Sequence, residues 1–420
     1  MITHSIQHRA LNDESYAICK ADMMVKGQDA ENIKIGNSFS EDRLKDEQFD
    51  YMLSNPPFGV EWKKVETFIT SEAKNLGFKG RFGAGLPRIS DGSLLFLQHM
   101  ISKFNKNGDI SRLAIVLNGS PLFTGSAGSG ESEIRRWVIE NDWLEAIIAL
   151  PTDMFYNTGI ATYVWIVTNK KISKRKGKIQ LINAVDLHTP MRKSLGNKRK
   201  QISPEQINTI TCLFGDFKEN EYCKIFDNAD FGYQRVTVER PLKLNFQTSP
   251  ERIETLQASA AFGKLKNPEK KSILAALSML NSDRIFKNRD VFEKNLKSAF
   301  KKMNVELKGS LLKTILQALS EKDETADICT NKKGEPETDA DLRDYENIPL
   351  KENIENYFKR EVLPHVPDAW IDHEKTKIGY EIPFNRHFYK YVPPRSLEEI
   401  DTDLDKVTSE IMQLLKEVHV

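Results

Sequence analysis

Apolar residues in the first half of the chain form short runs that alternate with longer stretches of helical spacing. Four runs, LAIVL, LEAIIAL, ATYVWIVT and KIQLINA, predict strands over 113–117, 144–150, 161–168 and 178–184. An amphipathic stretch over 131–141 separates the first two runs, which predicts a crossover helix between parallel strands. Another helix is predicted over 14–26. This alternation predicts an α/β fold with a Rossmann-like sheet over residues 1–203.

Weaker signals in the first hundred residues add elements to that sheet. Short apolar runs over 33–35 and 49–53 end in turn-forming residues and predict two more buried strands. Helical spacing over 90–104 predicts a helix, with Ser90 or Asp91 as its N-cap.

After about Ser203 the pattern changes to lysine-rich helical spacing with few strand signals. It predicts a mainly helical region over 204–395. A polar stretch near 323–346 contains Gly334 and Pro336, which favours a mobile linker or loop.

The last segment, 396–420, has apolar residues that step by alternating threes and fours. This is the a/d spacing of a heptad, made by Leu397, Ile400, Leu404, Val407, Ile411, Leu414 and Val418. Ser396 and Glu399 form a capping-box pattern at the start of the predicted helix. The pattern alone leaves two alternatives open, a helix that packs on its own domain and a helix that binds a partner.

Composition narrows the class of protein only slightly. The 420 residues, 39% of them hydrophobic, suffice for two or three domains. The 61 lysines and arginines nearly cancel the 60 acidic residues, so affinity for nucleic acid would have to come from local patches. The four cysteines form no CxxC pair, which points to neither zinc nor disulfides. No leader or membrane-length apolar segment appears in the sequence, so we expect a cytoplasmic protein without a membrane partner.

Residues Asn55, Pro56, Pro57 and Phe58 follow directly on the apolar run FDYMLS, at the carboxyl end of a predicted strand. Ligands bind at that edge in open α/β sheets. The Asn55 side-chain oxygen and the Pro56 carbonyl can accept the two hydrogens of an exocyclic amine, while Phe58 offers a face for stacking. A proline-rich turn without chemistry is the plainer alternative.

The wider sequence favours chemistry, because it resembles the modification subunits of type I restriction-modification systems. The resemblance is carried by FDYMLSNPPFGVEWKK, SDGSLLFLQHMISKF, the long segment from LNGSPLF to VTNKK, RKGKIQLINA and YEIPFNRHFYKYVPPRSLEEID. It extends from about Leu11 to the C-terminal helix.

The resemblance implies an adenine-specific DNA methyltransferase that transfers a methyl group from S-adenosyl-L-methionine to N6 of adenine in double-stranded DNA. It assigns the target adenine to Asn55, Pro56, Pro57 and Phe58, the cofactor to Asn37 and Asn55, and the target-base side to residues 156–158. Members of the family assemble as two modification subunits around one specificity subunit, together with a restriction subunit. No metal is implied.

The sequence departs from the family at its start. Members have a long helical region and a strand with a glycine-rich cofactor loop before the NPPF motif, and an acidic residue where this chain has Ala10. We therefore expect an N-terminally truncated sheet and weak cofactor binding by these 420 residues alone. Gly125, Gly128 and Gly130 are expected to form a surface loop and not to replace the missing glycine-rich cofactor loop. A non-catalytic remnant that keeps the assembly surfaces is the main alternative function. A small-molecule or protein amine methyltransferase is the other.

Two basic patches remain as candidates for DNA contact. One is made by Lys170, Lys171, Lys174, Arg175, Lys176 and Lys178, and the other by Arg192, Lys193, Lys198, Arg199 and Lys200. Charge runs of this kind are more often solvated turns, so both interpretations stay open.

Overall fold

A computed structural model of the chain describes residues 13–307, 309–391 and 393–418. Ala10, where an acidic residue was expected, lies outside them. The chain divides into two compact units, one of Met1–Thr124, Val138–Phe226 and Glu381–Val420 and one of Gly125–Trp137 and Asp227–Tyr380. None of the described helices combines the length and the apolar character that crossing a membrane requires.

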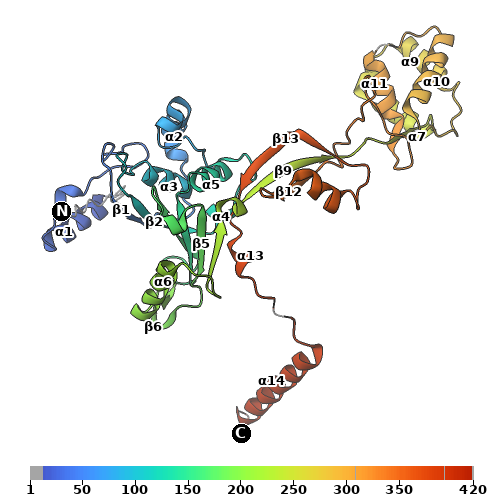
Figure 1. The fold of residues 1–420 in the computed structure, drawn as a ribbon. Helices are drawn as coiled ribbons and strands as arrows, with labels where there is room; N and C mark the ends of the chain where they lie inside the picture. Colours follow the sequence, from blue (N-terminus) through green and yellow to red (C-terminus); the bar gives the residue numbers. More distant parts are fainter. Residues whose placement is uncertain (1–12, 308, 392, 419–420) are drawn as a thin grey trace. The chain divides into compact units, whose positions relative to one another are not determined.

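The first unit is built on a six-stranded mixed sheet in the order β1-β2-β4-β3-β5-β8 (Figure 1). Its strands are β1 Tyr51–Ser54, β2 Arg112–Asn118, β3 Leu144–Leu150, β4 Thr162–Thr168, β5 Lys178–Asn183 and β8 Cys223–Asp227. β1 is parallel to β2, β3 is parallel to β5, and β4 runs antiparallel between β2 and β3. The strands β1, β2, β3 and β5 therefore end at the same edge. This confirms the predicted α/β sheet and its four central strands.

This unit also contains helices, two of which, near 14–26 and 90–104, were predicted from the apolar spacing. They are α1 Asp13–Val25, α2 Glu66–Leu76, α3 Ser93–Ile101, α4 Ser120–Phe123 and α6 Pro204–Asp216. The helix predicted over 131–141 is present as α5 Gly130–Glu140, most of which belongs to the second unit. All nine residues of α3 are buried, including the polar Ser93, Gln98 and His99, so the helix is enclosed on every side. α6 starts at a Ser203–Gln206 capping box and packs Ile210, Leu213 and Phe214 against the β5 side of the sheet.

Three expectations about the first hundred residues are wrong. Residues 33–35 form no strand, because Ile33 ends the 3-10 turn Ala30–Asn32 in an extended conformation without a pairing strand in the described chain. β1 was predicted to be buried, yet Tyr51 and Leu53 are 76% and 86% exposed, since β1 is the end strand of the sheet order. The N-cap of α3 is Gly92, although the Asp91 carboxylate does accept the Ser93 N–H.

The first unit also contains a hairpin and the end of the chain. The hairpin is formed by β6 Thr189–Leu195 and β7 Lys198–Gln201, and the final helices are α13 Phe384–Phe388 and α14 Leu397–Val418. The predicted capping box is present, because Ser396 and Glu399 exchange hydrogen bonds at 3.2 Å. Along α14 the stripe residues Leu404, Val407, Ile411 and Leu414 are all more than half exposed.

The second unit combines an antiparallel sheet, β12-β9-β13, with a helical module. The sheet strands are β9 Gly232–Glu239, β12 Asp344–Pro349 and β13 Trp370–Tyr380, covered by α12 Ile354–Tyr357 and the π-turn Phe358–Val362. The module contains α7 Pro250–Ala258, α8 Ala260–Gly263, α9 Asn267–Leu277, α10 Arg289–Lys302 and α11 Gly309–Ala318, with the short strands β10 Leu244–Phe246 and β11 Ser320–Lys322. Its core is rich in phenylalanine. The helical spacing predicted the helices of this region, but the strands β9, β12 and β13 were not predicted.

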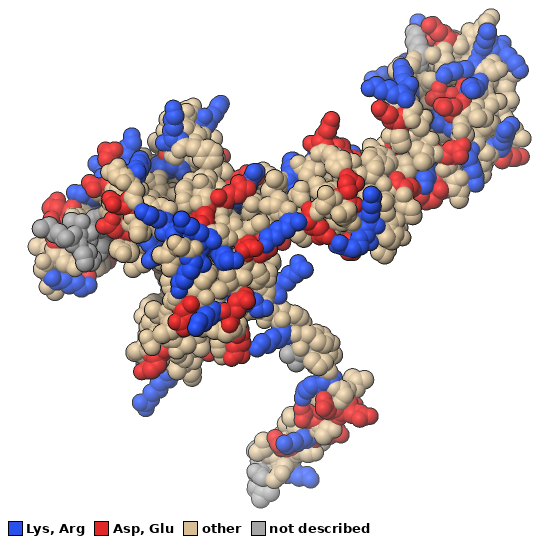
Figure 2. Space-filling model, viewed as in Figure 1, with Lys and Arg blue, Asp and Glu red and all other residues tan. Residues whose placement is uncertain are grey.

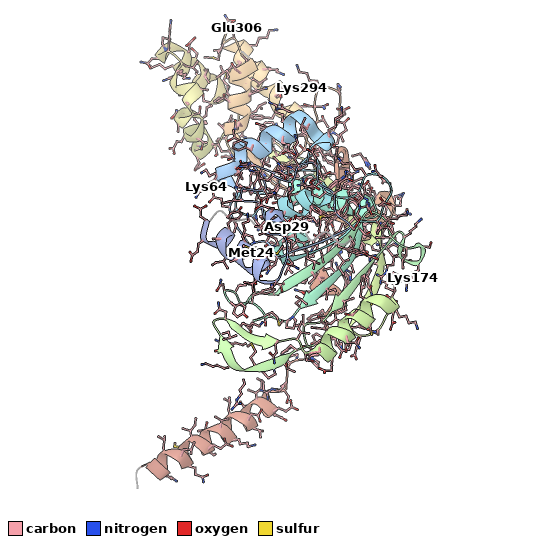
Figure 3. All side chains as sticks on the ribbon, turned by 90° about the vertical axis from the view of Figure 1, so that its left-hand side faces the viewer. Met24, Asp29, Lys64, Lys174, Lys294 and Glu306 are labelled. Carbon is pink, nitrogen blue, oxygen red and sulfur yellow. The ribbon has the colours of Figure 1, made fainter. Side chains whose placement is uncertain are left out.

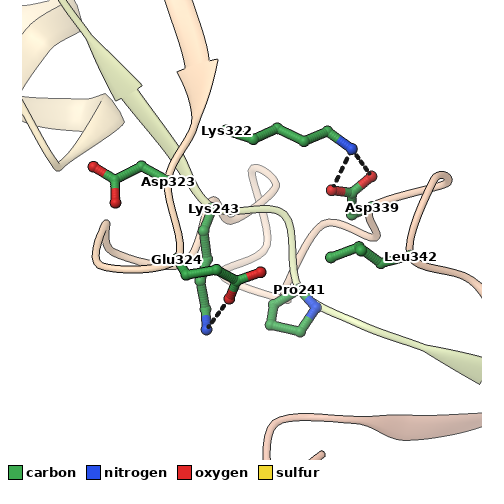
Figure 4. A pocket seen from close by; sticks show the side chains of 7 residues that line it. All are labelled: Pro241, Lys243, Lys322, Asp323, Glu324, Asp339 and Leu342. Atoms are coloured by element: carbon green, nitrogen blue, oxygen red, sulfur yellow. Dashed lines mark hydrogen bonds and ion pairs between the residues drawn. The ribbon is translucent and has the colours of Figure 1, made fainter.

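The segment predicted as a linker, 323–346, is instead a folded loop that leads into β12. The Glu337 N–H donates to Cys329 O at 2.8 Å and the Leu242 N–H donates to Glu337 O at 2.7 Å. A small pocket beside it contains Lys322, bonded to Asp339, and Lys243, paired with Glu324 (Figure 4). Because both lysines face carboxylates, this pocket is held by its own ion pairs and is a poor candidate for an anion site.

Candidate functional site

The NPPF motif lies where β1 leaves the sheet. Ser54 pairs with Ile115 of β2, and the backbone then turns away at Asn55. Pro56 is buried, whereas Asn55 is exposed and, within the described part of the chain, its side chain has no hydrogen-bond partner. Gly59 closes the turn at φ 60°, a conformation that favours glycine. The motif thus presents an unengaged amide at the carboxyl edge of the sheet.

An aromatic contact joins this motif to the loop between β3 and β4. The rings of Phe58 and Phe155 lie 5.9 Å apart, centroid to centroid, in an edge-to-face arrangement of 79°. Phe155 in turn bridges to Thr158, which closes the loop. The structure therefore brings together two segments that are about 100 positions apart in the sequence, and the predicted target-base residues 156–158 lie directly beside this contact.

Asn37, the predicted cofactor residue, is half-buried in a separate turn. Its Oδ1 accepts the Phe39 N–H at 3.0 Å, and its carbonyl accepts the Glu41 N–H at 2.7 Å. Neither bond reaches Asn55. Oδ1 accepts one hydrogen bond in the turn and keeps a second lone pair, and the amide nitrogen is available as a donor to a ligand.

A buried ionic network that the sequence analysis missed holds the Asn37 turn in place. The Arg81 guanidinium donates to Ser38 O at 2.6 Å, to Phe39 O at 2.8 Å and to the Glu72 carboxylate at 2.6 Å. Lys103 donates to Asp42 Oδ2 and to Leu44 O, both at 2.6 Å. Glu72 lies on α2, and the other three charged residues lie in loops and turns, so these bonds fix the Asn37 turn to the body of the first unit.

His99 of α3 lies inside this network, with Nδ1 3.2 Å from Arg81 Nη1. A guanidinium can only donate, so Nδ1 accepts and the imidazole is neutral. Burial, reinforced by the positive charges of Arg81 and Lys103, lowers the pKa of His99 from 6.5 to about 4. Although burial alone would raise the pKa of Glu72, its hydrogen bonds from Arg81 bring that pKa below its ordinary value.

We expect the free energy of unfolding to fall on acidification through this histidine. Between pH 6.5 and about 4 the unfolded chain binds a proton that the folded chain excludes, so stability is lost as the pH falls through this window. The loss at pH 5 relative to pH 7 should be about 2 kcal/mol. Urea unfolding at the two pH values measures it. His99→Gln keeps an acceptor for Arg81 and should show a smaller difference, whereas an equal difference in both proteins would contradict the assignment.

The two basic patches differ in the structure. In the first, Lys171 is buried and bonded to Asp142 at 2.6 Å, and Arg175 is buried against Glu145 and Gln180. Burial lowers the pKa values of both Lys171 and Arg175, although the neighbouring carboxylates oppose this. The second patch lies on the β6–β7 hairpin, where Arg192, Lys193 and Arg199 are exposed. At these two residues of the first patch the structure therefore shows buried ion pairs, and not the solvated turn that was the alternative to DNA contact.

The residues that would bind a methyl-donor cofactor are only partly present in the described chain. Between residues 13 and 50 it contains α1, a 3-10 turn and loops. The strand and glycine-rich loop that the resemblance places before NPPF are not in this segment. The loop at Gly125 and Gly128 has both glycines at positive φ, and Arg135 binds the Gly125 carbonyl, so that loop is tied into the second unit. The described residues thus include the NPPF motif and the Asn37 turn, but not the other segments that the resemblance assigns to cofactor binding.

Comparison with known proteins identifies the family. The sequence profile of N-6 DNA methylase matches residues 4–236, more than half of the chain. The chain belongs to the N-6 DNA methylase family. The profile spans the sheet, the NPPF motif and the Phe155 loop of this methylase, and the resemblance to type I modification subunits is confirmed.

Curated relatives of this methylase are subunits of type I restriction enzymes. The MjaIX methylase subunit of Methanocaldococcus jannaschii is 28% identical over 208 residues, which cover 49% of this chain and 35% of the relative. The HindI methylase subunit of Haemophilus influenzae is 30% identical over 182 residues, covering 43% and 38%. The chain thus spans little more than a third of the length of these relatives. The type I methyltransferase subunit of Streptococcus thermophilus has a TM-score of 0.44 at 22% identity, over 53% of this chain and 44% of that subunit.

Proposed function

We propose that this methylase is the modification subunit of a type I restriction-modification system and methylates N6 of adenine in double-stranded DNA. The observation that carries the proposal is the exposed, unengaged Asn55 amide at the carboxyl end of β1, beside the Phe58–Phe155 pair. Membership of the N-6 DNA methylase family supports it.

The chemistry needs alignment more than proton removal. The lone pair of an adenine amine is delocalised into the ring, so the nitrogen is a poor nucleophile until it becomes tetrahedral. In the proposed mechanism Asn55 Oδ1 and the Pro56 carbonyl accept the two amine hydrogens and direct the lone pair to the methyl donor. The two prolines hold the turn rigid, and Phe58 stacks on the extruded base. The proton leaves after transfer, because the methylated ammonium is strongly acidic.

The family and the fold imply S-adenosyl-L-methionine as cofactor, and when bound it supplies the methyl group. We assign Asn37, through its amide nitrogen, and Asn55 to its binding site. The Arg81 network supports this assignment, since it fixes the turn that carries Asn37. Residues 156–158 are assigned to the target-base side.

We also propose a specificity subunit as partner, with two copies of this chain around one such subunit and a restriction subunit in the full complex. The exposed apolar stripe of α14 supports a helical partner, because Leu404, Ile411 and Leu414 have no cover in the described chain. The names of the curated relatives are consistent with membership in a multi-subunit enzyme.

Transfer of tritium from labelled S-adenosyl-L-methionine tests the proposal. The chain is incubated with its specificity subunit and unmethylated duplex DNA, and the label is then separated between DNA and protein. We expect the label in DNA. Label confined to protein or to a small amine would favour a different methyl acceptor, and absence of all transfer would favour the non-catalytic remnant.

A further inference from the structure

The β6–β7 hairpin has a one-sided charge. From Leu187 to Pro204 the sequence contains five lysines and arginines and no acidic residue, in a chain whose net charge is only +1. The strands pair from Thr189–Gln201 to Leu195–Lys198, and the hairpin projects from the sheet next to α6 (Figures 1 and 3). Over the helical module of the second unit, by contrast, basic and acidic side chains are interspersed (Figure 2). The hairpin is therefore a local source of positive potential.

The sheet topology puts this hairpin at the edge where the NPPF motif lies. β5 is parallel to β3, and the hairpin follows β5 after a short turn. Leu150 at the end of β3 pairs with Thr162, which also pairs with Asn118 at the end of β2. The carboxyl ends of β1, β2, β3 and β5 thus form one edge, and both the candidate site and the hairpin extend from it.

Direct contacts join the hairpin to the loop that touches Phe58. The Asn197 N–H donates to Tyr156 O at 2.9 Å, and the Arg199 and Lys200 N–H groups donate to Asp153 O at 3.0 and 3.2 Å. Lys198 Nζ lies 5.1 Å from the centroid of the Tyr156 ring. A continuous path of contacts therefore leads from Phe58 through Phe155 and its neighbour Tyr156 to the basic strand β7.

The close approach of hairpin and loop requires a glycine. Gly196, at φ 61°, occupies the hairpin turn, and a Cβ added there would lie 2.6 Å from Tyr156 O. Because this turn is packed on the loop by main-chain bonds, the hairpin is held in one orientation beside the candidate site.

The first basic patch provides the contrast. It lies in the connection from β4 to β5, and β4 is antiparallel to β2, so this connection is at the opposite edge of the sheet. Lys174, which is labelled in Figure 3, lies away from the hairpin in that view. Two of the six cations in this patch are buried in ion pairs and four are exposed, so the patches differ mainly in the edge of the sheet at which they lie.

We propose that the β6–β7 hairpin is a phosphate-binding arm that holds duplex DNA beside the target-base site. The inference rests on the proposed function for the identity of the substrate, and on the hairpin geometry for the role of the arm. Arg192, Lys193 and Arg199 contact backbone phosphates, which positions the duplex without specifying sequence. The main-chain bonds to residues 153 and 156 couple that position to the loop at Phe58.

Fluorescence anisotropy of a labelled duplex of random sequence tests the arm on the full chain. The affinity is measured between about 50 and 200 mM salt, where each lost phosphate contact lowers the slope of log K against log salt by about 0.9. We expect Arg192→Gln/Lys193→Gln/Arg199→Gln to lower the slope by about 2 to 3 and to weaken binding about tenfold or more. The matched control, Lys106→Gln/Lys170→Gln/Lys176→Gln, removes three exposed charges at the opposite edge and should leave the slope unchanged.

Arg192→Lys/Arg199→Lys keeps the charge and should keep the slope, which tests the arm even if the triple hairpin variant misfolds. Equal slopes for the wild type and the hairpin variant, equal losses in the hairpin and control variants, or no duplex binding by the wild type would each overturn the proposal. The tritium assay separates it from the proposed function. If the wild type transfers methyl groups and the hairpin variant binds DNA as the wild type does, only the phosphate-binding arm is wrong. If DNA binding depends on the hairpin but no methyl group is transferred, only the proposed methyltransferase activity is wrong.

Discussion

Asn55→Ala should lower the rate of DNA methylation by about 100-fold or more while changing cofactor affinity much less. The substitution removes the side-chain acceptor that aligns the adenine amine, and lost positioning combined with a lost hydrogen bond commonly has an effect of this size. Single-turnover methyl transfer by the assembled enzyme measures the rate, and calorimetry with the cofactor measures the affinity.

Two further variants sharpen this test. Asn55→Asp retains an acceptor oxygen and should keep more activity than the alanine variant. Asn107→Ala alters an exposed asparagine in the loop before β2, at the opposite edge of the sheet, and should methylate at the wild-type rate. A normal rate for Asn55→Ala would show that the assigned role is wrong.

The double substitution Leu404→Asp/Ile411→Asp should abolish co-purification with the specificity subunit. Both side chains are more than half exposed on α14 and lie on its heptad stripe, so a partner helix would bury them. Two unpaired charges in such a seam cost about several kcal/mol each. The melting profile of the chain itself should not change, because the stripe makes no core in the described residues.

Thr402→Asp/Ser409→Asp is the matched control for the helix. It adds the same charge on the opposite face of α14, where both side chains bond only to the preceding turn of the helix. This variant should capture the specificity subunit normally. Loss of capture in both variants would indicate a general charge effect, and unfolding of the stripe variant would indicate that α14 is internal core.

The sequence predicted the central strands of the sheet, whose side chains are buried on at least one face. β2, β3, β4 and β5 are nearly continuous apolar runs, because a central strand of a covered sheet meets core on each side. The same logic failed at β1. Its run FDYML is equally apolar, but an end strand has a neighbour on one side only, and neither Tyr51 nor Leu53 is covered in this structure.

The strands of the second unit could not be predicted from the pattern of apolar and polar positions. β13, WIDHEKTKIGY, has charged residues through its middle, and Lys375 pairs there with Asp372 and Glu239 rather than with the core. β12 carries Tyr345 exposed and only Ile348 fully buried. Strands that are covered in this partial way leave no clean alternation of apolar and polar positions.

The candidate site shows the same division. NPPF could be recognised in the sequence because its four residues are contiguous. Arg81 bonds to Glu72 and Ser38, which are 9 and 43 positions away in the sequence, so no local motif predicts these contacts. The two basic patches look alike in sequence. Only the order and direction of the strands separate a patch at the site edge from one at the opposite edge.

Mass spectrometry of nucleosides tests the central claim most directly. The enzyme, assembled with its specificity subunit, methylates duplex DNA, which is then digested completely. We predict N6-methyl-2′-deoxyadenosine as the product with the wild type, and its loss with Asn55→Ala. Since the NPPF geometry would also suit the amine of cytosine, a methyl group on cytosine N4, or an undiminished N6-methyladenine signal in the Asn55→Ala variant, would contradict the account.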